Sequence, residues 1–267
     1  MKSLWKQKTK IEFFHHKPNI IENFPIIEYK DLKLQWVKKA REDFQNRAKK
    51  GDNNIPGFTH LSRCPGIFEL FKYGYVITLH EDIKIMPKKG EGFEWMSSSS
   101  FHSGPGPDNV IIEGQFDSIG QQQLNSFVHL IPRPPWTNDF IMKISTGWHV
   151  IAPKCLKFLV LPIAYPDTFD FTSTMGVLDP SMATQINFQM YWNATEPETI
   201  IRAGTPLGHL IPLSEKKYQM VQRIANQQDR DWVNKFNSAR RSSFWPMKMH
   251  NKIIDMYNKH WHGYETK

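Results

Sequence analysis

The stretch from Phe169 to Leu213 constrains the fold more than any other part of the chain. It reads FDFTSTMGVLDPSMATQINFQMYWNATEPETIIRAGTPLGHLIPL. Its short apolar runs are separated by Gly, Pro, Asp and Ser, which is typical of short strands joined by tight turns. Residues 185–192 alternate between apolar and polar side chains, which predicts a strand with one buried and one wetter face. The stretch therefore favours a compact β structure.

Further strand-like segments lie on both sides of residues 185–192. They are rich in β-branched and aromatic residues and are bounded by turn residues; they lie at 74–79, 83–85, 110–112, 127–131, 140–144, 148–152, 158–163, 199–202 and 207–213. A Gly-, Ser- and Pro-rich segment at 88–107 predicts a long exposed excursion. Many short strands without alternating helices predict a mainly β protein with a β-clip-like or jelly-roll-like barrel core.

The two ends of the chain differ from this core. Residues 1–29 predict an extended arm lying across a surface, and apolar residues at 3- and 4-residue spacings over 31–50 predict an amphipathic helix that begins at Asp31 and ends at Gly51. From Ser214 onward the spacing is again helical. We therefore expect a basic arm and helix at 1–62, a β-rich core at 63–213 and a basic helical extension at 214–267.

Charge is distributed unevenly along the 267 residues, which carry a formal net charge of +8. Residues 1–50 hold 13 Lys and Arg against 6 Asp and Glu, residues 214–267 hold 11 against 5, and the middle holds 10 against 15. Basic ends can bind nucleic acid phosphates, or pack on the acidic middle of a neighbouring subunit in a homo-oligomer or larger assembly. They can also be ordinary solvated helix faces.

Composition limits the compartment and the chemistry. The sequence contains 2 cysteines, Cys64 and Cys155, without the spacing of a zinc site, and a reducing compartment is expected. We find no apolar run of about 18 residues, which predicts no membrane contact. The N-terminus lacks the apolar segment of a signal peptide, so export by that route is not expected.

The order of motifs over residues 147–213 resembles the dUTPase and dCTP deaminase family, which has a β-clip core. The motifs that carry the resemblance are Gly-Val-Leu-Asp at 176–179, Gln-Ile-Asn at 185–187 and Gly-Thr-Pro-Leu at 204–207. The pair formed by Gly-Val-Leu-Asp and Gly-Thr-Pro is also similar to uncharacterised proteins of tailed phages. The phage resemblance implies a location in the host cytoplasm or in the virion.

The dUTPase resemblance implies a nucleotide site with Asp179 as the residue that positions the attacking water. It places Asn187, Gly204 and Gln185 among the ligand-binding residues. Met182 stands where the family has a Tyr that stacks on deoxyribose, and Gln185 replaces a carboxylate used for proton transfer. Glutamine cannot exchange a proton, so the sequence predicts a degenerate site. Without catalysis, Asp179 would act as the capping residue of a turn.

A second candidate site is His80-Glu81-Asp82. His80 and Asp82 have the spacing of the two ligands that the facial iron triad takes from one strand edge. This interpretation implies an Fe(II)- and 2-oxoglutarate-dependent oxygenase with a divalent metal as cofactor. The alternative interpretation of the same three residues is an ordinary polar hairpin turn.

The sequence thus leaves three functions open. We favour a phage-type binding or assembly protein, associated with the virion or with itself and without demonstrable catalysis. The alternatives are a dUTPase-like enzyme that binds or hydrolyses a nucleotide through Asp179, and an iron oxygenase that uses His80 and Asp82.

Overall fold

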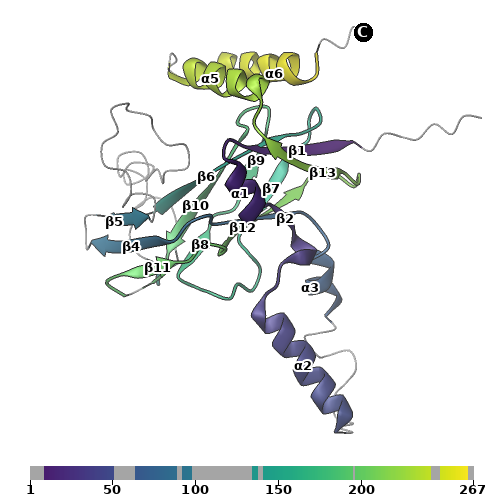
Figure 1. The fold of residues 1–267 in the computed structure, drawn as a ribbon, viewed down its shortest axis with the longest axis vertical. Coiled ribbons are helices and arrows are strands. Elements are labelled where there is room, and N and C mark those ends of the chain that lie inside the picture. The colour runs from purple at the N-terminus through teal and green to yellow at the C-terminus, as the bar shows by residue number, and fades with distance from the viewer. Residues whose placement is uncertain are drawn as a thin grey trace, which may run out of the picture.

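A computed structural model describes residues 9–50, 64–88, 92–97, 134–137, 141–194, 196–241 and 247–263. Within these ranges it contains thirteen strands in three sheets and five helices. Figure 1 shows the sheets in the middle of the molecule, the helix α2 projecting from one end and the helices α5 and α6 lying side by side at the other. The predicted mainly β fold with helical extensions is confirmed.

The longest of the described strands is mostly buried and lies inside a five-stranded sheet. Its order is β13-β1-β6-β10-β8, with β1 at Lys10–His15, β6 at Ile141–Ile151, β8 at Phe171–Ser173, β10 at Gln185–Trp192 and β13 at Gln219–Ile224. Strand β6 is buried at nine of its eleven positions because neighbours flank it on both edges and other layers cover its faces. Strand β1 pairs antiparallel with β6 and parallel with β13.

A second five-stranded sheet and a three-stranded sheet complete the β structure. The second sheet has the order β2-β3-β12-β7-β9, with β2 at Ile27–Glu28, β3 at Tyr75–Thr78, β7 at Phe158–Leu161, β9 at Gly176–Leu178 and β12 at Pro206–Pro212. The third sheet has the order β11-β4-β5, with β4 at Ile83–Lys88, β5 at Gly92–Ser97 and β11 at Thr199–Ile201. The described strands form three separate sheets and not the closed barrel that the sequence suggested.

The two five-stranded sheets pack face to face over one hydrophobic core. Gly208 of β12 lies so close to β10 that a Cβ atom there would overlap the Phe188 ring. Large side chains from both sheets fill the layer between them, among them Phe13, Trp148, Phe158, Phe188 and Trp192, each at most 1% exposed. Burial of aromatic side chains of this size is a major source of folding free energy.

The five helices lie outside the sheets. They are α1 at Pro18–Asn23, α2 at Gln35–Lys49, α3 at Pro65–Leu70, α5 at Gln227–Arg241 and α6 at Met247–Trp261, with a 3₁₀ turn at Tyr29–Asp31. Helix α2 buries none of its residues. Helices α5 and α6 enclose Trp232 and Tyr257, and the Tyr257 hydroxyl contacts the backbone of Ala152. No described helix is long and apolar enough to cross a membrane.

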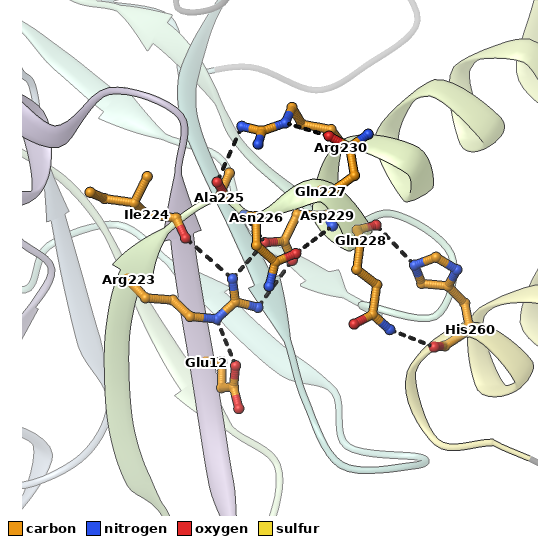
Figure 2. Close-up of polar contacts among 10 residues, drawn as sticks. All are labelled: Glu12, Arg223, Ile224, Ala225, Asn226, Gln227, Gln228, Asp229, Arg230 and His260. Carbon is orange, nitrogen blue, oxygen red and sulfur yellow. Dashed lines mark hydrogen bonds and ion pairs between the residues drawn. The ribbon is translucent and has the colours of Figure 1, made fainter.

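A partly buried ion-pair network ties α5 to the first sheet (Figure 2). The Arg223 guanidinium at the end of β13 donates to both carboxylate oxygens of Asp229, at 2.5 and 3.0 Å, and to Glu12 of β1 at 2.9 Å. Asp229 is fully buried, and it also accepts the backbone N–H of Asn226, which caps the start of α5. The network joins residues that lie more than two hundred positions apart in the sequence.

Several local predictions require correction. Helix was predicted for residues 219–224 because the apolar residues at 218, 221 and 224 have helical spacing. The segment is instead strand β13, whose backbone pairs with β1. Strand β1 lies inside a sheet and not across a surface. Helix α2 begins at Gln35, not Asp31, and part of the predicted 88–107 excursion is strand β5. The strands predicted at 110–112 and 127–131 lie outside the described residues.

Candidate functional site

Exposed apolar side chains concentrate between residues 165 and 177. Tyr165 is 57% exposed, Phe169 72%, Met175 74% and Val177 59%. These are four of the nine large apolar side chains that are exposed among the described residues, and they fall within thirteen positions. Exposed apolar side chains are usually scattered singly over a protein surface, so four of them within so few positions make this segment a candidate for binding. We call residues 165–177 the apolar segment.

The apolar segment is held in place by contacts to helix α2. The Asp167 carboxylate accepts the backbone N–H of Gln35 at 3.0 Å, which satisfies a free donor of the first helical turn. The Trp36 indole donates to the Tyr165 carbonyl at 2.8 Å. The side chain that caps this helix therefore comes from a loop more than one hundred residues away, and not from Asp31, at which the sequence predicted the helix to begin.

A groove of about 610 Å³ lies between β9 and β10, beside the end of the apolar segment. We call it the β9–β10 groove. One wall carries the polar side chains of β10, and the other carries β9 and the turn that follows. Its lining consists of Lys143, Val160, Thr174, Met175, Gly176, Val177, Leu178, Met182, Ala183, Gln185, Asn187, Phe188, Gln189 and Phe236.

Three amide side chains form a row along the wall of this groove. Gln185, Asn187 and Gln189 are alternate residues of β10, so they lie on one face of the strand, as the sequence predicted. The Gln185 amide donates to the Ser145 hydroxyl at 2.8 Å, while the buried Asn187 carbonyl oxygen has no hydrogen-bond partner among the described residues. The groove can thus offer hydrogen-bond donors and acceptors to a ligand, and Lys143 is the single charged side chain among the described residues that line it.

Asp179 lies at the end of β9, and its carboxylate is engaged in local contacts. One oxygen accepts the backbone N–H of Ser181 at 3.0 Å and its hydroxyl at 2.5 Å, and the other pairs with the Lys157 ammonium at 3.2 Å. The Asp179 carbonyl accepts the N–H groups of Met182 and Ala183. These contacts are those of an Asp that closes a turn, and they position the end of the groove.

Gly204 is separated from the other predicted ligand-binding residues. It lines a different cavity of about 480 Å³, which is bordered by Leu34, Ile163, Phe169, Phe171 and Leu207. Gly204 has φ +86°, so its role in the turn before β12 accounts for a glycine at this position. The structure therefore brings Gln185 and Asn187 together in the β9–β10 groove and places Gly204 elsewhere.

The two residues of the predicted iron site have separate surroundings. The Asp82 carboxylate accepts the backbone N–H of Ala203 at 2.8 Å and pairs with Arg202 at 2.6 Å, and these two contacts lower the pKa of Asp82. The His80 ring is buried beside His15, with ring centroids 6.2 Å apart, and burial lowers its pKa. No three His, Cys, Asp or Glu side chains in the described ranges are arranged to hold a metal ion.

Comparison with known proteins adds no family. A scan against protein-family models finds no match to this chain, and a search of curated proteins also finds none.

The apolar segment was not recognised from the sequence as a functional feature. Its signal was present, because Tyr165, Phe169, Met175 and Val177 interrupt polar turn residues, but only the fold shows that they point away from the core.

Proposed function

We propose that this protein is a phage-type binding and assembly protein that associates with itself or with a larger particle, in the host cytoplasm or the virion. The observation that carries the proposal is the apolar segment, whose four large side chains are more than half exposed and of which Met175 and Val177 line an open groove. Burial of apolar surface is the main favourable term in protein association. Contact with a second protein surface would remove these side chains from water.

The charge distribution supports the same function. The segments 1–50 and 214–267 are strongly basic, whereas the middle of the chain is acidic. Opposite charges on different parts of one chain favour association between copies, and they raise the rate at which copies meet. The resemblance of the Gly-Val-Leu-Asp and Gly-Thr-Pro pair to tailed-phage proteins supports the phage-type assignment.

Size-exclusion chromatography with multi-angle light scattering tests the proposal. We expect a mass larger than the 31.3 kDa of one chain at micromolar concentration, and a smaller mass on dilution or at high salt. A species that stays at 31.3 kDa up to millimolar concentration, at low and at high salt, would argue against self-association. Attachment to a larger particle would then need that particle to be supplied.

One observation favours nucleotide binding as a second candidate function. Within the described part of the chain, the Asn187 carbonyl oxygen is buried without a partner, in a groove that also offers Gln185, Gln189 and Lys143. A base amino group could satisfy that oxygen, and Lys143 could meet a phosphate. Thermal-shift measurements with deoxynucleotides test this function. Stabilisation in the wild type that is lost in Asn187→Leu supports it, and no stabilisation above about 1 kcal/mol at saturating ligand counts against it.

A further inference from the structure

The cavity of about 480 Å³ between β8, an edge strand of the first sheet, and the start of β12 is large and mainly apolar. We call it the β8–β12 cavity. Its described lining comes from three parts of the chain, which are Leu34, residues between 162 and 173, and residues 203–207. Voids from imperfect packing are seldom larger than a water molecule, whereas sites for small molecules have volumes of about 300 to 1,000 Å³. The volume therefore indicates a binding site.

Two irregularities of the backbone border this cavity. Strand β12 has one residue more than β3 between Pro206 and Gly208, so Leu207 is bulged, and its buried side chain lines the cavity. Bulges are frequent beside binding sites, where they redirect a side chain. In the loop that forms another wall, Tyr165 has φ +53°, which residues other than glycine rarely adopt. Strained residues of this kind concentrate at functional sites.

The walls of the β8–β12 cavity are fixed by contacts outside it. The Tyr165 carbonyl and the Asp167 carboxylate both accept hydrogen bonds from the first turn of α2, which holds the loop in place. The Ser173 hydroxyl of β8 donates to the Leu207 carbonyl of β12, which joins two of the walls. A preformed site loses less conformational entropy when a ligand binds, and this favours affinity.

Polar side chains of the lining are engaged within the protein. The Thr168 hydroxyl donates to Asp170 at 2.7 Å, and the Thr172 hydroxyl accepts the Asn193 amide at 2.8 Å. Asp167, which caps α2, is the one charged side chain among the lining residues that the structure describes. A carboxylate without a cation beside it repels anionic ligands such as phosphates and carboxylates. The cavity is therefore suited to a neutral ligand that is held by apolar contact.

We propose that the β8–β12 cavity binds a neutral aromatic small molecule. Rigid rings make up much of the lining and favour a flat partner; they belong to Pro162, Pro166, Phe169, Phe171 and Pro206. Contacts between aromatic rings contribute free energy beyond that of the area they bury. Phe169 is 72% exposed, and a bound ring would cover part of it. This binding is separate from the proposed self-association and does not depend on it.

Two fluorescent dyes with the same ring system test the proposal. N-phenyl-1-naphthylamine is neutral, 8-anilinonaphthalene-1-sulfonate carries an added sulfonate, and both become brighter when they move from water into an apolar site. We expect the neutral dye to bind saturably at a single site per chain, and the sulfonate dye to bind at least tenfold more weakly. Equal affinity for the two dyes, or no saturable binding of the neutral dye, would overturn the proposal.

Three variants locate the bound dye. Ala203→Trp places a large side chain in the cavity and should weaken binding of the neutral dye at least tenfold. Phe169→Ala removes an exposed ring from the wall and should weaken it at least threefold; because this ring is outside the core, the test stands even where Ala203→Trp fails to fold. Ala183→Trp makes the same change in the β9–β10 groove and should leave the affinity for the dye unchanged.

Circular dichroism on each variant and light scattering on the same samples complete the test. If folded Ala203→Trp and Phe169→Ala bind the neutral dye as tightly as the wild type, the dye binds elsewhere and the proposal is wrong. A chain that stays monomeric but binds the dye in this cavity argues against self-association and supports the cavity as a binding site. A chain that associates but binds no neutral dye keeps the proposed function and refutes this inference.

Discussion

Acidification from pH 7 to pH 5 should destabilise this protein because three histidines are buried as neutral rings. His15 is 2% exposed, His149 5% and His209 1%. Burial lowers the pKa of His15 to about 4, of His149 to about 3 and of His209 to about 4, each from 6.5. Neighbouring imidazoles depress the first two further, whereas the Tyr73 carbonyl partly offsets the effect of burial at His209.

The direction of this pH effect follows from how many protons the folded and the unfolded chain bind. Above pH 6.5 the rings are neutral in both the folded and the unfolded chain, so they contribute no pH dependence to the free energy of unfolding. As the pH falls below 6.5 the unfolded chain binds protons that the folded chain excludes, so the free energy of unfolding decreases until the folded pKa is reached. At pH 5 the difference spans about 1.5 pH units, or about 2 kcal/mol per histidine at 1.36 kcal/mol per unit.

Three histidines together predict a loss of about 6 kcal/mol at pH 5, which is comparable to the whole stability of a typical domain. Urea unfolding followed by tryptophan fluorescence at pH 7 and pH 5 measures the loss directly. The pKa of Asp82 is lowered below 3.8, so its contribution is lost only at more acidic pH. The window between pH 6.5 and 5 therefore reports on the histidines.

Two variants of the His149 site sharpen the test. His149→Gln removes the ring and should reduce the loss between pH 7 and pH 5 by about 2 kcal/mol. Thr184→Val removes the hydroxyl that lies 3.0 Å from the His149 ring nitrogen but keeps the imidazole, so it should lower stability at both pH values and keep the pH-dependent loss. A wild-type stability that is equal at pH 7 and pH 5 within about 1 kcal/mol would refute the reasoning.

Three other substitutions test the turns and the ion-pair network by urea unfolding. Gly147 has φ +69°, and a Cβ there would lie 2.5 Å from a buried imidazole nitrogen, so Gly147→Ala should cost at least about 2 kcal/mol. This loss of stability should exceed that of Gly204→Ala, because Gly204 also has a positive φ but a Cβ there would meet nothing within 4 Å. Equal losses for the two variants would show that the contact with the imidazole costs nothing. Arg223→Met leaves the buried Asp229 without its cation and should cost about 3 to 5 kcal/mol, part of which Asp229→Asn should restore. A double variant no more stable than Arg223→Met would contradict this account. Asp179→Ala should cost about 1 to 2 kcal/mol by removing the turn contacts, and an unchanged stability would show that they contribute nothing.

Strand positions were predictable wherever alternation and turn residues agree. Residues 185–192 were predicted as a strand with a wetter face, and β10 occupies that range with Gln185, Asn187 and Gln189 on one face. Residues 219–224 show why the rest was not predictable. Apolar residues three positions apart indicate a helix, and only the parallel pairing with β1 shows that this segment is a strand.

The candidate site was predictable to the same extent. The dUTPase resemblance placed Gln185 and Asn187 among the ligand-binding residues, and both line the groove because residues two apart on a strand face the same way. Gly204 could not be placed from the sequence, because its distance from them depends on how the two sheets pack. The exposure of Met175 and Val177 also could not be inferred, since apolar residues in a strand-like segment normally face the core.

The sequence by itself determined the mainly β class, the positions of most strands and the separation of basic ends from an acidic middle, because these follow from local periodicity and composition. The tertiary structure alone decided that the first and last described strands pair inside one sheet and that Asp167 caps α2. These features depend on contacts between residues far apart in the chain, and local patterns carry no information about such contacts.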